Sequence, residues 1–230
     1  MVTMPLCDSA AAFRPFDGTD AAVAREGEFE IELEPGGYRR DGEGRVLVAP
    51  AAVLNYGIAK NWEAVIEGEV VHGLSDTTPA HGLVGTGAFL KGVLREGSLQ
   101  DRTGPSVATE FGVLLPEVHG AHSAGASLAV IASQRFAALT VHLNVAGALT
   151  REQHGDVFTS VIAEGPRDWR VRPVVEILRD QDFGNGTTTS GLLGAIWQVS
   201  NGLAFDSAMR RGRAEGHRLD EIRAGLTFSF

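Results

Sequence analysis

The residues of this chain that are equipped for chemistry are seven histidines, a single cysteine and a few serines near them. Ser123 beside His122 is the nearest approach to a nucleophile with its base, but adjacent residues rarely form a catalytic dyad. The sequence contains no GxSxG, no Walker motif and no GxGxxG between a strand and a helix. We therefore predict no enzyme, no catalytic residue and no cofactor. A lipase-like barrel enzyme with a serine near the outer rim stays open as an alternative.

The histidines do not predict a metal site. Only His142 falls inside an expected strand, and the other six lie in polar segments between strands without a fixed spacing to carboxylates that would hold a metal ion. The six are His72, His81, His119, His122, His154 and His217.

A larger set of ionisable residues recurs at every second position of apolar stretches. In "EFEIELE", Phe29, Ile31 and Leu33 alternate with glutamates, a period of two that indicates a strand with one polar face. The candidates for the polar face of such strands are Glu30, Glu32, Glu63, Glu67, Glu69, Lys91, Arg95, Glu110, Glu164, Arg172, Glu176, Asp206, Arg210 and Arg223.

The alternation predicts about twelve strands, which leave about 18 residues for each strand and its connection, enough to cross a membrane. Connections at one end of the expected sheet are mostly short, whereas those at the other end are longer and polar. The strands are expected at 28–34, 51–58, 62–71, 87–95, 107–115, 126–133, 139–147, 157–163, 171–178, 190–199, 203–210 and 222–230. Pro173 requires a bulge, because proline removes a hydrogen bond from the ladder.

Composition excludes several classes of protein. The formal charge of -9 and the absence of a basic cluster argue against a nucleic-acid partner. No apolar run approaches the roughly 18 residues of a membrane-spanning helix. Cys7 alone can form neither an intramolecular disulfide nor a cysteine-based zinc site.

The last seven residues, "AGLTFSF", form an alternating strand that ends on an aromatic ring. In lipid every backbone polar group needs an internal partner, so a closed barrel whose last strand pairs with its first satisfies this constraint. The fold class that we predict is all-β, a closed antiparallel transmembrane β-barrel over residues 13–230. Residues 1–12 are expected to be the tail of a secretory signal or a disordered leader.

Several segments resemble the family of outer-membrane transporters named for the meta-pathway of phenol degradation. The similar segments are "PFDGTDAAVAREGEFEIELE", "VLNYGIAKNWEAVIEGE", "GPSVATEFGVLLPE", "VSNGLAFDSAM" and "AGLTFSF". The resemblance implies passage of small solutes, aromatic compounds among them, across the outer membrane of a Gram-negative bacterium. As in outer-membrane barrels generally, it implies that Phe230 is a signal for the barrel assembly machinery. The expected partners are the lipid bilayer, lipopolysaccharide, that machinery and a small-molecule solute.

The expected function is a passive channel for small solutes. Nine of the polar-face candidates are acidic and five are basic, so a lumen that they line carries a net charge of -4 and favours cations. Their charges could also pair across a narrow interior and plug it, and a soluble β-protein that binds a small ligand is a further alternative. Trp62, Trp169 and Trp197 are expected in an aromatic girdle near the short connections.

Overall fold

The computed structural model describes residues 14–42, 44–74, 81–118 and 121–230, which form one antiparallel sheet closed on itself. The predictions for residues 1–12 fall outside these residues. Within the described ranges no helix is long and apolar enough to cross a membrane, and the one helical element is the short 3-10 helix η1 (Ser98–Gln100).

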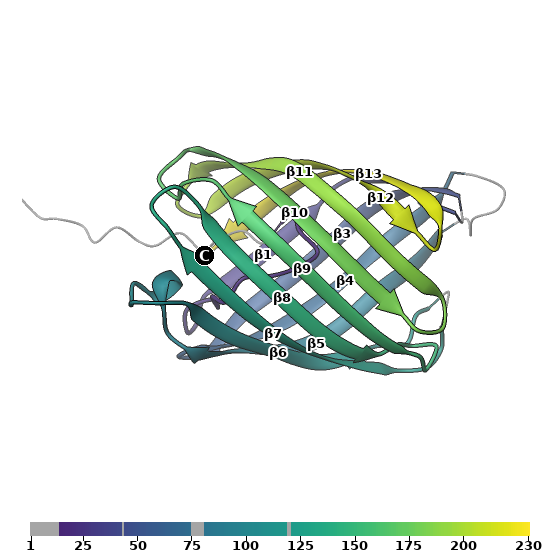
Figure 1. Cartoon of the computed structure of the whole chain (residues 1–230), viewed down its shortest axis with the longest axis horizontal. Helices are drawn as coiled ribbons and strands as arrows, with labels where there is room; N and C mark the ends of the chain where they lie inside the picture. Colours follow the sequence, from purple (N-terminus) through teal and green to yellow (C-terminus); the bar gives the residue numbers. More distant parts are fainter. Residues whose placement is uncertain (1–13, 43, 75–80, 119–120) are drawn as a thin grey trace, which may run out of the picture.

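Thirteen strands form the sheet (Figure 1). They are β1 (Phe29–Glu34), β2 (Gly37–Arg40), β3 (Arg45–Ala59), β4 (Trp62–Gly73), β5 (His81–Arg95), β6 (Ser106–Leu114), β7 (Gly125–Arg135), β8 (Thr140–Leu149), β9 (Gly155–Glu164), β10 (Val171–Asp182), β11 (Gly186–Ser200), β12 (Leu203–Ala214) and β13 (His217–Ser229).

β1 and β2 share one position in the wall, because both pair with β3 on one side and with β13 on the other. The barrel therefore has twelve strand positions, and the predicted fold class is confirmed. Leu33 pairs with Leu226, and Tyr38 pairs with Ile222. The stretch of chain between Leu33 and Tyr38 is therefore one residue longer than the stretch of β13 that lies opposite it. Pro35 lies in this interval, where its missing N–H costs the ladder nothing.

All twelve predicted strands are present, but many are longer than the alternation indicated. β10 and β11 are separated by only three residues, and β12 and β13 by two, so the polar "RDQDFGNG" and "GRAEGH" segments are largely strand. The predicted contrast between short and long connections is weaker than expected. The reason is that backbone pairing continues past the apolar part of each strand, whatever the side chains are.

The two faces of the strands differ as the alternation predicted. Large apolar side chains such as Phe111, Leu143 and Val161 are exposed on the outside. Inside, described apolar clusters are small, and one of them joins Val174, Ile196 and Ala204. The buried surface is instead rich in carboxylate, amide, hydroxyl and basic groups.

The bulge expected at Pro173 is absent, and that prediction is wrong. Pairing between β10 and β11 runs through Pro173↔Ala195 without a shift. The carbonyl of Pro173 accepts a hydrogen bond from the N–H of Gly165 at 2.9 Å, so its ring nitrogen faces the turn that ends β9. Proline is tolerated there because the ladder between β9 and β10 begins one residue later, at Val174.

The end of the barrel that holds Phe230 is called the C-terminal end, and the opposite end the loop end (Figure 1). Phe230 exchanges two backbone hydrogen bonds with Phe29, at 2.9 and 3.0 Å, which extends the closure between the first and last strands. The ring of Phe29 stacks against both Phe230 and Tyr56. Trp62, Trp169 and Trp197 are exposed near the same end, where the sequence placed an aromatic girdle.

Candidate pore and its inner belt

Residues 14–24, called the belt, lie inside the barrel and take no part in its wall (Figure 1). Successive residues contact strands in reverse order around the circumference. Arg14 reaches β1 and β12, Asp17 reaches β10, Thr19 reaches β8, Ala21 reaches β7 and Ala24 reaches β4. The turn at 25–28 then leads into β1. Residues 14–28 belong to the barrel domain that the sequence predicts, and the wall itself begins at Phe29.

The belt is bound through its backbone to side chains of the wall. Six N–H groups donate to side-chain oxygens, and each acceptor comes from a strand position that faces inward. The pairs are Arg14 to Glu32 (3.0 Å), Asp17 and Gly18 to Glu176 (3.0 and 2.8 Å), Thr19 to Asn144 (3.0 Å), Ala21 to Ser133 (2.9 Å) and Ala24 to Glu63 (2.6 Å).

Each charged side chain of the belt between Arg14 and Asp20 meets opposite charge. Asp17 pairs with Arg210 and with Arg223, the latter at 2.8 Å. Asp20 lies 3.7 Å from the ammonium group of Lys91. The buried pairs require such compensation, because an isolated charge removed from water is costly.

Arg14 completes the pattern at the start of the belt. Its guanidinium pairs with Glu34 and lies 3.6 Å from the carboxylate of Asp206. Since Glu34 and Asp206 belong to β1 and β12, Arg14 joins two wall elements on either side of β13.

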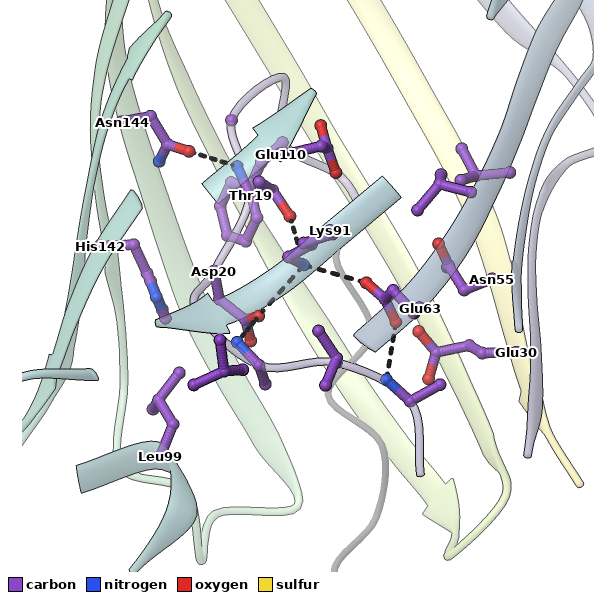
Figure 2. A pocket seen from close by; sticks show the side chains of 18 of the residues that line it. Thr19, Asp20, Glu30, Asn55, Glu63, Lys91, Leu99, Glu110, His142 and Asn144 are labelled. Atoms are coloured by element: carbon purple, nitrogen blue, oxygen red, sulfur yellow. Dashed lines mark hydrogen bonds and ion pairs between the residues drawn. The ribbon is translucent and has the colours of Figure 1, made fainter. Parts of the chain in front are cut away.

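Lys91 is the centre of a compact network (Figure 2). Its ammonium group contacts Glu63 at 3.3 Å, Asp20 at 3.7 Å and the hydroxyl of Thr19 at 3.1 Å. Glu63 in turn accepts the N–H of Ala24. Lys91 therefore compensates one wall carboxylate and one belt carboxylate together.

A second network joins three neighbouring strands. Ser133 on β7 lies 2.8 Å from Nδ1 of His142 on β8, and Nε2 of His142 lies 3.3 Å from Glu164 on β9. Glu164 also pairs with Arg172 at 3.4 Å. Serine, histidine and glutamate in this order resemble a hydrolytic triad. Ser133 is only 1% exposed, however, and its oxygen accepts the belt N–H of Ala21.

The described part of the barrel encloses a larger and a smaller cavity. The larger, of about 860 Å³, extends from the C-terminal end past the belt and reaches Glu67, Glu110, Ala146 and Phe158. The smaller, of about 310 Å³, lies at the loop end. These two cavities share no lining residue. They adjoin along β9, where Phe158 lines the larger cavity and Asp156 the smaller.

The predicted polar-face residues are mostly where the alternation placed them. Thirteen of the fourteen are buried or half-buried and either line the larger cavity or pair with groups inside the barrel. Arg95 is the exception and requires a correction. The pairing of β5 with β6 shifts between Val93 and Arg95, and Arg95 is exposed at the C-terminal end beside Gly104.

Pairing divides the carboxylates into two groups. Glu63 is compensated by Lys91, and Glu69 by Arg39 at 3.1 Å. Among the described residues, Glu67 and Glu110 line the larger cavity without an ion pair. Glu30 lies in the same cavity and accepts a hydrogen bond from Ser229 at 3.0 Å. The negative charge that faces open space therefore comes from fewer residues than the sequence suggested.

The mouth of the larger cavity at the C-terminal end includes Lys60 and Asn61. Hydrogen bonds from Asn61 and Lys60 lower the pKa of the partly exposed Glu96 carboxyl below its usual value. This glutamate lies in the connection between β5 and β6, outside the spanning strands.

The other chemical candidates stay apart. His122 and Ser123 are exposed in the connection between β6 and β7, and His119 lies outside the described residues. Within the described residues, no group of three or more histidine, cysteine, aspartate or glutamate residues is placed to hold a metal ion.

Sequence reasoning missed the belt and the network of Ser133. The belt has no alternation of its own, and its partners are distant in the chain. The only signal for the network was His142, the single histidine inside a predicted strand.

No family model and no curated protein matches this chain. Solved structures do resemble it. The COG4313 outer-membrane channel from Pseudomonas putida F1 superposes with a TM-score of 0.65 at 8% identity, over 91% of this chain and 97% of that one. The KdgM porin, solved with disordered oligogalacturonate, gives a TM-score of 0.59 at 11% identity, over 87% and 99% of the two chains.

The chain has the fold of outer-membrane β-barrels, a closed antiparallel wall with an apolar outer surface and a polar interior. This fold agrees with the predicted location in the outer membrane of a Gram-negative bacterium. The resemblance to the family named for phenol degradation stays a prediction.

Proposed function

We propose that this protein is an outer-membrane channel through which small solutes pass passively. The observation that carries the proposal is the 860 Å³ cavity, which opens along the inner wall past the belt and reaches Glu67 and Glu110, carboxylates with no ion pair among the described residues. A cavity of this kind favours cations and neutral solutes over anions, because desolvated carboxylates repel negative charge.

The wall of the same cavity also contains apolar groups. Val53, Val65, Val93 and Phe158 lie among its lining residues. We propose that solutes with an apolar or aromatic body are accommodated against them, as the family resemblance implied. A barrel of twelve strand positions is narrow compared with the sixteen or more of an aqueous porin, so conductance should be small.

Planar-bilayer recordings of the refolded protein test this function. We expect weak conductance and a reversal potential that indicates cation preference across a KCl gradient. Replacing both Glu67 and Glu110 by glutamine should reduce that preference. Asp220→Asn is the matched control, because Asp220 pairs with Arg211 and Arg218 at the loop end and does not line the larger cavity. Anion preference would contradict the role of the carboxylates.

An ester hydrolase is the second candidate, favoured by the hydrogen-bonded order Ser133, His142 and Glu164. We propose that these residues anchor the belt instead, because the Ser133 oxygen is buried against the N–H of Ala21. Labelling by a fluorophosphonate probe decides between the two. Labelling that disappears in Ser133→Ala would establish the hydrolase.

A further inference from the structure

We propose that the inner wall of this barrel is a binding track for an extended polypeptide, and that the belt is its tethered occupant, which leaves the track to open the channel. The opening step rests on the proposed channel function, whereas binding of a polypeptide to the track can be tested without it.

The track is made of side chains and not of a strand edge. Glu32, Glu176, Asn144, Ser133 and Glu63 accept the belt's backbone N–H groups from five different strands. Backbone N–H groups are common to all polypeptides apart from proline, so these acceptors suit an extended chain as a class. No strand pairing involves residues 14–24, and the belt can therefore leave without breaking the ladder of the wall.

The track also selects for sequence. A positive residue is required near Glu34 and Asp206, and negative residues three and six positions later face Arg210, Arg223 and Lys91. This alternation of wall charges fits the order Arg14, Asp17 and Asp20.

Shape adds a second requirement. A Cβ atom on Gly18 would clash with the Ser160 hydroxyl and lie 2.9 Å from Nδ2 of Asn144. Ala21 is fully buried between Ala108 and Ile131. Larger side chains at either position would force the segment off the wall, since these neighbours belong to paired strands.

A short tether connects the belt to the wall. The N–H of Gly27 donates to Gly57 of β3 at 2.8 Å, and Gly27 has a φ of +83°, a conformation that other residues rarely adopt. The turn at 25–28 thus stays on the wall while the belt departs, which would keep a displaced belt close to its track.

The test removes the belt and returns it as a separate peptide. A chain that lacks residues 2–24 is refolded, with heat-modifiable migration as the check of barrel formation. A fluorescently labelled peptide of residues 14–24 should bind this barrel, and a Gly18→Val peptide should bind at least tenfold more weakly. In bilayers the truncated barrel should conduct several times more than the full chain, and the added peptide should reverse the increase.

Substitutions in the wall test where the peptide binds. Glu176→Gln in the truncated barrel should weaken the peptide at least tenfold, because Glu176 accepts two belt N–H groups. Asp182→Asn is the matched control on the same strand, since the described hydrogen bonds of Asp182 go to Gly184 and Asn185 in the turn after β10 and not to the belt. It should leave peptide affinity unchanged.

A folded truncated barrel that binds both peptides equally, or neither, overturns the track. Equal conductance of conducting full-length and truncated barrels overturns the opening step. If the wild-type peptide binds more tightly than the Gly18→Val peptide but neither the full-length nor the truncated barrel conducts, the channel function is contradicted and the track is established. If the truncated chain does not fold, Gly18→Val in the full chain replaces it, and unchanged conductance in that variant overturns the opening step.

Discussion

The wall and the belt of this protein are held by different forces. Neighbouring strands are joined by backbone hydrogen bonds in continuous ladders, which depend little on side-chain identity. The belt is held by six bonds from its backbone to wall side chains and by buried ion pairs. A single substitution can remove a belt contact, whereas a ladder is broken only by losing many bonds together. We therefore expect that substitutions can release the belt while the wall stays folded.

The largest expected effect concerns the closing strand of the wall. Phe230→Asp should prevent barrel assembly, because Phe230 extends the closure with Phe29 and its ring is the proposed signal for the assembly machinery. Heat-modifiable migration of outer-membrane fractions on a gel measures it. Phe183→Asp, an equally exposed phenylalanine at the loop end, is the control and should assemble. Normal assembly of Phe230→Asp would refute the assignment.

A smaller effect separates the two faces of one wall strand. Leu143→Arg should destabilise the barrel by about 2–4 kcal/mol, because Leu143 is exposed on the outer face and would place a charge in hydrocarbon. Ala146→Arg on the same strand faces the cavity and should cost much less. Urea-dependent refolding in lipid vesicles measures both. Equal losses of stability would show that Leu143 and Ala146 are assigned to the wrong faces.

The boundary between the two cavities should affect conduction more than stability. Phe158→Ala should join the cavities and raise single-channel conductance by about twofold or more, since a narrow segment dominates the resistance of a pore. The outward-facing Val157→Ala is the control on the neighbouring residue. Unchanged conductance with Phe158→Ala would place the constriction at the belt alone.

The smallest effect is expected at Ser133, whose side-chain oxygen accepts a belt N–H. Ser133→Ala leaves the N–H of Ala21 and Nδ1 of His142 without this partner. The cost should be about 1–3 kcal/mol, and it should appear as faster protease cleavage of the belt and not as loss of the wall. Ser127→Ala, on the same strand but without a hydrogen bond to the belt among the described contacts, should leave cleavage unchanged. Wall unfolding in Ser133→Ala would mean that belt and wall are one cooperative unit.

The alternation of residues was sufficient to predict the strands and their faces. Glu30, Glu63 and Glu176 were placed on the inner face because side-chain direction along a strand depends only on a period of two. The same rule failed at Arg95, where a register shift interrupts the period. It also could not show which charges are compensated, because Lys91 and Asp20 are 71 positions apart in the chain.

A closed antiparallel barrel with an apolar outside and an acidic inside could be predicted from the sequence, because these properties follow from local alternation and from the need to pair every backbone group in lipid. The position of residues 14–24 within the barrel could not be predicted and is seen in the folded structure. Their binding depends on side chains from eight wall strands that meet only when the sheet closes. No local pattern in the chain specifies such a meeting.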